Sequence, residues 1–174
     1  MKALFKILFV VSSLAFIFYL LLPAPFFPEP PPDALQSDEP ADLEDPLRRG
    51  YYTDLSRQEV LEHYQKEFNK SPLGSLSLPT YRLNYPPEEA QTKIRDQTRS
   101  TFLEEIVHPF RESLFINGFE PKLDKDVILI EDKIWRQKII VKYVQSRTLI
   151  RVAAGIATLA LACILFREWG KEFK

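Results

Sequence analysis

Two long apolar runs stand near the ends of the chain, and a stretch that mixes polar and apolar positions separates them. Residues 4–22 read LFKILFVVSSLAFIFYLLL, with Lys6 as the only charge, and residues 148–166 carry only Arg151. Each run approaches the roughly 20 residues that a helix needs to cross the hydrocarbon core of a bilayer. The pattern predicts two transmembrane helices, over 4–22 and 148–166, with the lipid bilayer as a partner.

The first run also fits a secretory signal, because Lys2 and Lys6 place positive charge before an apolar segment. A clear small-x-small cleavage site is missing, since the run continues into Pro23-Ala24-Pro25. We favour an uncleaved signal anchor over a removed signal peptide. In the second run, small residues around Gly155 offer a close approach for another helix, and Arg151 is near enough to the end to snorkel to the interface.

Positive charge near the ends of the two runs indicates their orientation. Bases flank the outer ends of both runs, whereas no Lys or Arg occurs from residue 23 to residue 47. By the positive-inside rule, residues 1–3 and the basic tail 167–174 are expected in the cytoplasm. Lys138, Lys142, Arg147 and Arg151, which lie before or near the start of the second run, count against this orientation. The expected location is a bacterial inner or plasma membrane, with two spans and both termini cytoplasmic.

Residues 23–47 are rich in proline and acidic side chains. Such a composition buries little apolar surface and favours extended polyproline II backbone. We therefore expect a disordered linker over residues 23–47. The alternative interpretation is that this segment is a ligand for a proline-recognising groove on another protein.

The soluble domain is expected over residues 48–147. Ser56 followed by Glu59 forms a capping box, and the next apolar positions make one helical stripe. The stripe contains Val60, Leu61, Tyr64 and Phe68. Residues 78–85 alternate as in a half-buried strand, and Pro87 then begins a second expected helix that continues to about Val107.

Three strands are expected in the remainder, over residues 113–119, 127–130 and 134–144, the last two as a hairpin around Glu131-Asp132-Lys133. The order is then helix, strand, helix and three strands. This order predicts an α/β (α+β) two-layer soluble domain, with helices on one face of a mainly antiparallel sheet, flanked by the two transmembrane helices.

Composition limits the kinds of chemical site that the domain can contain. The net charge of −1 gives no reason to expect a nucleic-acid partner, and the single cysteine, Cys163, excludes an intramolecular disulfide. The glycines of the domain are too far apart for a phosphate-binding loop. His63 and His108 are interpreted as packing or surface residues, and Glu104-Glu105 as solvated neighbours on a helix. We expect no catalytic residues, no metal site, no cofactor and no enzymatic activity.

Two sets of residues are candidate sites. Alternation in the last strand places Arg136, Lys138 and Lys142 on one face, which suits anionic lipid headgroups or an acidic partner. The alternative is a solvated face balanced by acids such as Glu131 and Asp132. The second set is an apolar groove between helices and sheet. Its candidate residues are Tyr81, Tyr85, Phe115 and Trp135.

The resulting hypothesis is a membrane-anchored, non-enzymatic interaction or scaffold protein that presents a small α/β domain on the extracytoplasmic side to a membrane protein partner. The alternatives are a membrane-tethered module that binds lipid or a small ligand, and an accessory subunit of a membrane enzyme or transporter complex.

Overall fold

The computed structural model describes residues 2–71, 74–86 and 101–172. The chain divides into two compact units, Met1–Ala24 with Ser146–Lys174, and Pro25–Gln145. Each unit is described separately below.

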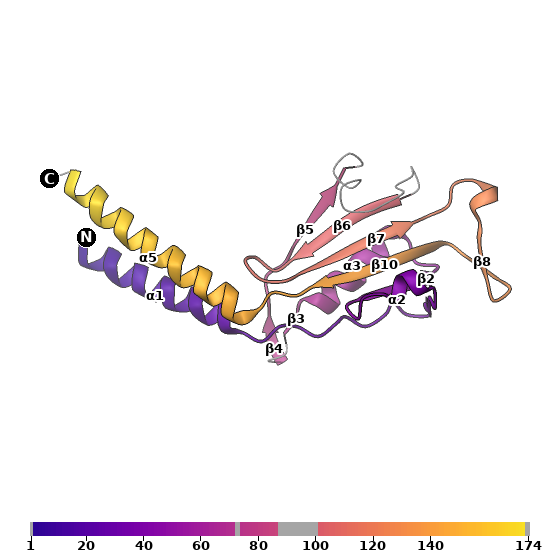
Figure 1. The fold of residues 1–174 in the computed structure, drawn as a ribbon, viewed down its shortest axis with the longest axis horizontal. Helices are drawn as coiled ribbons and strands as arrows, with labels where there is room; N and C mark the ends of the chain where they lie inside the picture. The colour runs from indigo at the N-terminus through magenta and orange to yellow at the C-terminus, as the bar shows by residue number, and fades with distance from the viewer. Residues whose placement is uncertain (1, 72–73, 87–100, 173–174) are drawn as a thin grey trace. The chain divides into compact units, whose positions relative to one another are not determined.

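The first unit is a pair of helices, α1 (Lys2–Leu21) and α5 (Thr148–Glu172), that lie side by side (Figure 1). The rings of Phe5 and Phe9 lie 5.7 and 5.8 Å from the ring of Phe166. Gly155 is buried against Leu20, and a Cβ at this glycine would collide with the leucine side chain. Both helices are long and apolar enough to cross a membrane.

Arg151 ties the two helices together. Its Nε donates a hydrogen bond to the carbonyl of Leu20 at 2.7 Å, and a terminal guanidinium nitrogen donates to the carbonyl of Leu22 at 2.5 Å. The last carbonyls of a helix receive no hydrogen bond from an N–H of the same helix, and the partial negative charge at this end attracts cations. Arg151 is buried, so it caps α1 rather than only reaching toward an interface.

The second unit is a mixed helix and sheet domain. Among the described residues, six strands form one antiparallel sheet in the order β1-β2-β10-β7-β6-β5 (Figure 1). The strands are β1 (Leu35–Gln36), β2 (Arg48–Thr53), β5 (Tyr81–Tyr85), β6 (Thr101–Val107), β7 (Ser113–Phe119) and β10 (Gln137–Val144). Two short hairpins lie outside this sheet, β3 (Lys70–Ser71) with β4 (Gly74–Ser77) and β8 (Ile128–Ile130) with β9 (Lys133–Trp135).

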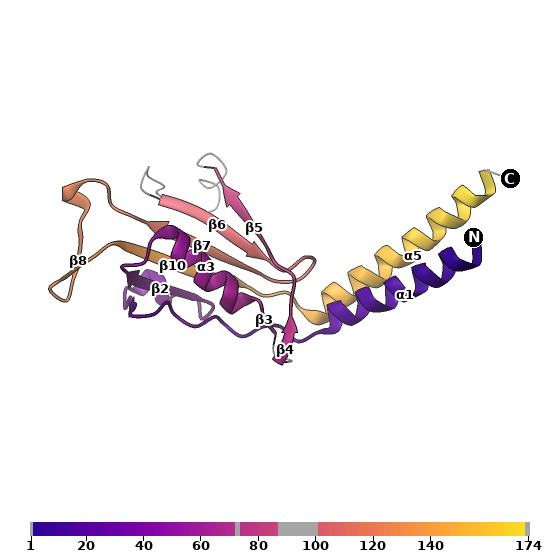
Figure 2. The same cartoon turned by 180° about the vertical axis from the view of Figure 1, so that it is seen from behind.

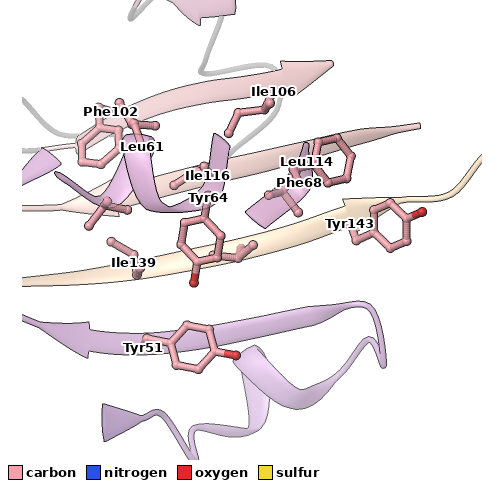
Figure 3. Close-up of a cluster of buried hydrophobic side chains, with 12 residues drawn as sticks. Tyr51, Leu61, Tyr64, Phe68, Phe102, Ile106, Leu114, Ile116, Ile139 and Tyr143 are labelled. Carbon is pink, nitrogen blue, oxygen red and sulfur yellow. The ribbon is translucent and has the colours of Figure 1, made fainter. Parts of the chain in front are cut away.

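Helix α3 (Arg57–Phe68) covers one face of the sheet, as Figure 2 shows. It begins with the expected capping box, in which Ser56 and Glu59 bond to each other's backbone amides. The expected stripe on α3 is buried, and Figure 3 shows its side chains over the sheet. The sheet contributes Tyr51, Phe102, Ile106, Leu114, Ile116, Ile139, Val141 and Tyr143 to this core.

The second expected helix is wrong over its last turns. Residues 101–107 form strand β6, not the last turns of a helix, and they pair with both β5 and β7. The run TFLEEIV is buried at nearly every position, which is typical of a central strand with both faces covered. The earlier part of the expected helix, residues 87–100, lies outside the described residues.

Residues 25–47, expected as part of a linker, belong to the domain and are here named the strap. Leu35 pairs with Tyr52 in the sheet, and α2 (Pro40–Leu43) follows, with Asp42 buried. Pro28 and Pro31 are buried as well. Proline has no backbone N–H to satisfy, so its ring can be buried without a lost hydrogen bond at nitrogen.

Ion pairs fasten the strap to the sheet face opposite α3, here named the outer face. Lys138 Nζ lies 2.8 Å from Asp42 Oδ2 and 2.7 Å from Glu39 Oε1. Burial disfavours the ammonium, but the hydrogen bonds from Lys138 to Asp42 and Glu39 outweigh burial and raise its pKa. Gly50 makes the contact possible, because a Cβ there would collide with Asp42.

Lys138→Met tests this attachment. The change leaves the Asp42 carboxylate, whose side chain is 2% exposed, with only Arg48 at 3.9 Å. A buried carboxylate that loses its main cation is costly, so we expect a loss of about 2–4 kcal/mol in the free energy of unfolding. Thermal unfolding of the full chain in detergent, followed by circular dichroism, measures it.

Lys142→Met is the matched control, because Lys142 lies on the same strand face and pairs with Asp45 at 3.7 Å in a half-exposed setting. Its expected cost is below about 0.5–1 kcal/mol. Equal losses for the two variants would contradict the role of the Lys138 contact.

Candidate functional site

The three candidate basic residues do not all lie on one strand face. Lys138 and Lys142 share the outer face of β10, whereas Arg136 lies in the link between β9 and β10. Arg136 Nε donates to Glu120 Oε1 at 2.8 Å. All three cations therefore have carboxylate partners, and these come from the strap and from Glu120, not from Glu131 and Asp132.

Three of the four candidate aromatic residues share the outer face. Strand alternation and the register place Tyr81, Tyr85 and Phe115 opposite the core residues of β6 and β7. The rings of Tyr85 and Phe115 are 6.1 Å apart, and the Tyr85 hydroxyl donates to Glu105. Trp135 is not part of this set, because it lies on β9 with its ring 6.5 Å from that of Tyr52.

Alternation on β6 also decides the roles of Glu104 and Glu105. Glu104 faces α3, where Arg57 Nε donates to it at 2.9 Å, and Glu105 faces the outer side. Adjacent strand residues point to opposite faces, so the two carboxylates are separated by the sheet.

The β8–β9 hairpin presents apolar side chains to solvent. Leu129 and Ile134 are direct partners in the register and are 61% and 66% exposed. Val127 follows the same alternation and is exposed as well. Trp135 points the other way and is buried. The exposed set Val127, Leu129 and Ile134 is here named the hairpin patch.

Asp54, which follows β2, contacts the hairpin beside its turn through Lys133 and at its base through Arg136. Lys133 Nζ lies 2.7 Å from Asp54 Oδ2, and the backbone N–H of Arg136 donates to Asp54 Oδ1 at 3.2 Å. The hydrogen bond from Lys133 lowers the pKa of Asp54, so this carboxylate is charged at neutral pH.

The sequence predicts a hairpin around Glu131-Asp132-Lys133, and β8 with β9 confirms it. The expected single strand over 134–144 is wrong, because Arg136 divides it into β9, which pairs with β8, and β10, which belongs to the six-stranded sheet. The exposure of the hairpin was not predicted. The run VILI looks like a buried strand because every residue is apolar. The hairpin patch differs from a buried strand in two ways: it lies beside an acidic turn, and it lies outside the six-stranded sheet. The sequence shows the acidic turn, whereas only the strand pairing shows that the hairpin is outside the sheet.

The two histidines are bound by backbone carbonyls. His63 Nε2 lies 3.0 Å from the carbonyl of Glu29, which fastens α3 to the strap. His108 is buried, with Nε2 2.9 Å from the Phe68 carbonyl and Nδ1 3.2 Å from that of Pro79. Burial lowers the pKa of His108, and these hydrogen bonds oppose that effect only in part. Within the described ranges no three His, Cys, Asp or Glu side chains are grouped as metal ligands.

Comparison with known proteins gives no match: neither a family model, nor a curated protein, nor a solved structure is similar to this chain at a significant level.

The turn of the hairpin gives a stability prediction. Glu131 and Asp132 have φ values of 52° and 60°, as in a type I′ turn, where Asn-Gly is strongly preferred. Glu131→Asn with Asp132→Gly relieves this strain, so we expect a gain of about 0.5–1 kcal/mol or more, seen as a higher Tm of the full chain.

The matched control changes Lys125→Asn with Asp126→Gly in the neighbouring 3₁₀ turn, Asp124–Asp126, where φ is not positive. Added glycine is unfavourable there, so the control is expected to lower Tm. A fall in Tm for the hairpin variant would contradict the strained type I′ turn.

Proposed function

We propose that this chain is a membrane-anchored, non-enzymatic interaction protein whose extracytoplasmic domain offers the hairpin patch to a membrane protein partner. The observation that carries the proposal is the hairpin patch itself, three large apolar side chains exposed on and beside one hairpin that Asp54 joins to the end of β2. Exposed apolar clusters on soluble domains mark interaction sites more often than single exposed residues do.

Placement of α1 and α5 in a bilayer is supported by the outer surfaces of the two helices. A helix in the core of a soluble protein hides its apolar side chains, whereas these helices expose most of theirs. Large exposed side chains include Leu4, Phe5, Ile7, Leu8, Val10, Val11, Leu14 and Phe18 on α1, and Leu149, Ile150, Ile156, Leu161, Ile164 and Leu165 on α5.

Retention of α1 in the mature protein is supported by Arg151. The guanidinium uses the last carbonyls of α1 as acceptors, and Gly155 packs against Leu20. A cleaved α1 would leave a charged side chain in an apolar helix without these partners, which is expensive in lipid. We therefore propose a signal anchor that stays, in a two-span hairpin with both termini cytoplasmic.

Orientation is supported by the charges that flank the helices. Lys2 and Lys6 lie at one end of α1, and Arg167 and Lys171 lie near the end of α5. In an antiparallel pair of spans these bases fall on the same side, where the positive-inside rule places the cytoplasm. The location proposed on this basis is a bacterial inner or plasma membrane.

The partner is proposed to be a membrane protein with an exposed apolar surface. Binding of this type depends on a few large side chains that become fully desolvated. If the partner is an enzyme or a transporter, the chain is its accessory subunit, and the same surface applies.

Leu129→Ser with Ile134→Ser tests the proposal. Truncating two central apolar contacts is expected to weaken partner binding by at least about 10- to 100-fold, since each is worth about 1–2 kcal/mol or more. Quantitative co-purification of the tagged full chain from its native membranes, in mild detergent, measures the amount of partner retained.

Leu43→Ser is the matched control, because Leu43 is similarly exposed on α2, on another part of the domain. It should leave partner recovery unchanged. Equal recovery for both variants, or no stoichiometric partner with the unmodified chain, would overturn the proposed role of the hairpin patch.

A further inference from the structure

The turn between β6 and β7 holds an aromatic side chain outward in an unfavourable backbone conformation. The N–H of Arg111 donates to the carbonyl of His108 at 3.0 Å, which closes a β-turn with Pro109 second and Phe110 third. Phe110 has a φ of 60° and is 75% exposed. The third position of such a turn favours glycine, and a bulky residue there is an outlier that often has a functional reason.

The base of this turn is rigid. The N–H of His108 donates to the carbonyl of Glu112 at 3.0 Å, and the His108 ring is buried between two carbonyls. Arg111 and Glu112 form an ion pair at 2.9 Å, with both side chains fully buried. The neighbours of Phe110 therefore point inward, and the phenylalanine ring is held at the tip.

This turn lies at the end of the sheet where the chain enters and leaves the domain. Val144, the last residue of β10, pairs with Ser113, and only residues 145–147 separate it from the first residue of α5. At the same end the Tyr143 hydroxyl donates to the carbonyl of Pro25 at 3.2 Å. The tether to α5 is residues 145–147, and the tether to α1 is residues 22–24. Three residues span at most about 10 Å, so both tethers are short.

A second aromatic side chain belongs to the same end. Phe26, next to Pro25, is 83% exposed, although its neighbour Phe27 packs against the core. Two exposed phenylalanines beside two short tethers suit a bilayer interface, where aromatic rings concentrate. A protein partner would also cover them, but only the bilayer is held close by both tethers at once.

We propose that Phe110 and Phe26 insert into the interface of the bilayer, and so form a membrane contact of the domain in addition to the two spans. This contact fixes how the domain stands on the membrane, and with it the direction in which the hairpin patch is presented. The inference rests on the proposed membrane insertion of α1 and α5.

Depth measurements by spin labelling test the proposal in the full chain, reconstituted in vesicles of phosphatidylcholine and phosphatidylglycerol. The single native cysteine, Cys163 in α5, reports on membrane insertion without any substitution. In a Cys163→Ala background, Phe110→Cys and Phe26→Cys carry the label in separate variants. Lys125→Cys is the control, because Lys125 is exposed and follows β7 at the opposite end of that strand.

The expected result is a ratio of oxygen to nickel-chelate collisions several-fold higher at positions 110 and 26 than at 125, and highest at 163. Circular dichroism confirms that each labelled variant is folded, and either labelled position suffices if the other variant fails to fold. A deep label at 163 with water-exposed labels at 110 and 26 would overturn this inference and leave the proposed function intact.

Two other outcomes are decisive. Labels at 110 and 26 that neither reagent reaches would show that protein covers the turn, which also overturns the inference. A water-exposed label at 163 would refute membrane insertion and therefore the proposed function as well.

Discussion

The apolar contact between α3 and one face of β10 holds the domain together. Ile139, Val141 and Tyr143 face the helix and are almost fully buried against the α3 stripe. Strand β10 pairs with β2 on one side and β7 on the other, so this contact also fixes the middle of the sheet. The other face of β10 holds the strap through Lys138.

Side chains alternate along β10, so Lys138 and Lys142 lie on the face opposite the core. There they form ion pairs with Asp42 and Asp45 of the strap. The strap is therefore ordered although its composition is typical of disordered segments. Three of its prolines, Pro25, Pro28 and Pro31, are buried, and a proline nitrogen needs no hydrogen bond. The acids Glu39, Asp42 and Asp45 pair with Lys138 and Lys142 of β10. These ion pairs depend on a strand about 100 residues away in the sequence, which local composition does not reveal.

The features that sequence patterns predict correctly are those that depend on interactions between residues close in sequence. The capping box of Ser56 and Glu59, the stripe of α3 and the strand Ser113–Phe119 are confirmed, because each depends on residues close in sequence. Strand β6 was predicted as a helix, since Phe102, Leu103 and Ile106 fit a helical face as well as a buried strand. Of the candidate groove, Tyr85 and Phe115 come together through pairing of β6 with its neighbours, while Trp135 leaves the set with its own hairpin.

The two ends of β10 have different surroundings. One end follows the hairpin patch, and the other pairs with the start of β7, which follows the Phe110 turn. Eight residues of strand separate these ends by about 26 Å. The hairpin patch and the Phe110 turn therefore lie toward opposite ends of the same sheet.

The topology of the chain tests this account most directly. Single cysteines at Lys2, Lys125 and Lys171, each in a Cys163→Ala background, are treated with a membrane-impermeant maleimide on intact cells. Position 125 is expected to be labelled from outside, and positions 2 and 171 only after permeabilisation. Labelling of all three positions from the same side, or loss of position 2 from the mature chain, would contradict a retained two-span hairpin.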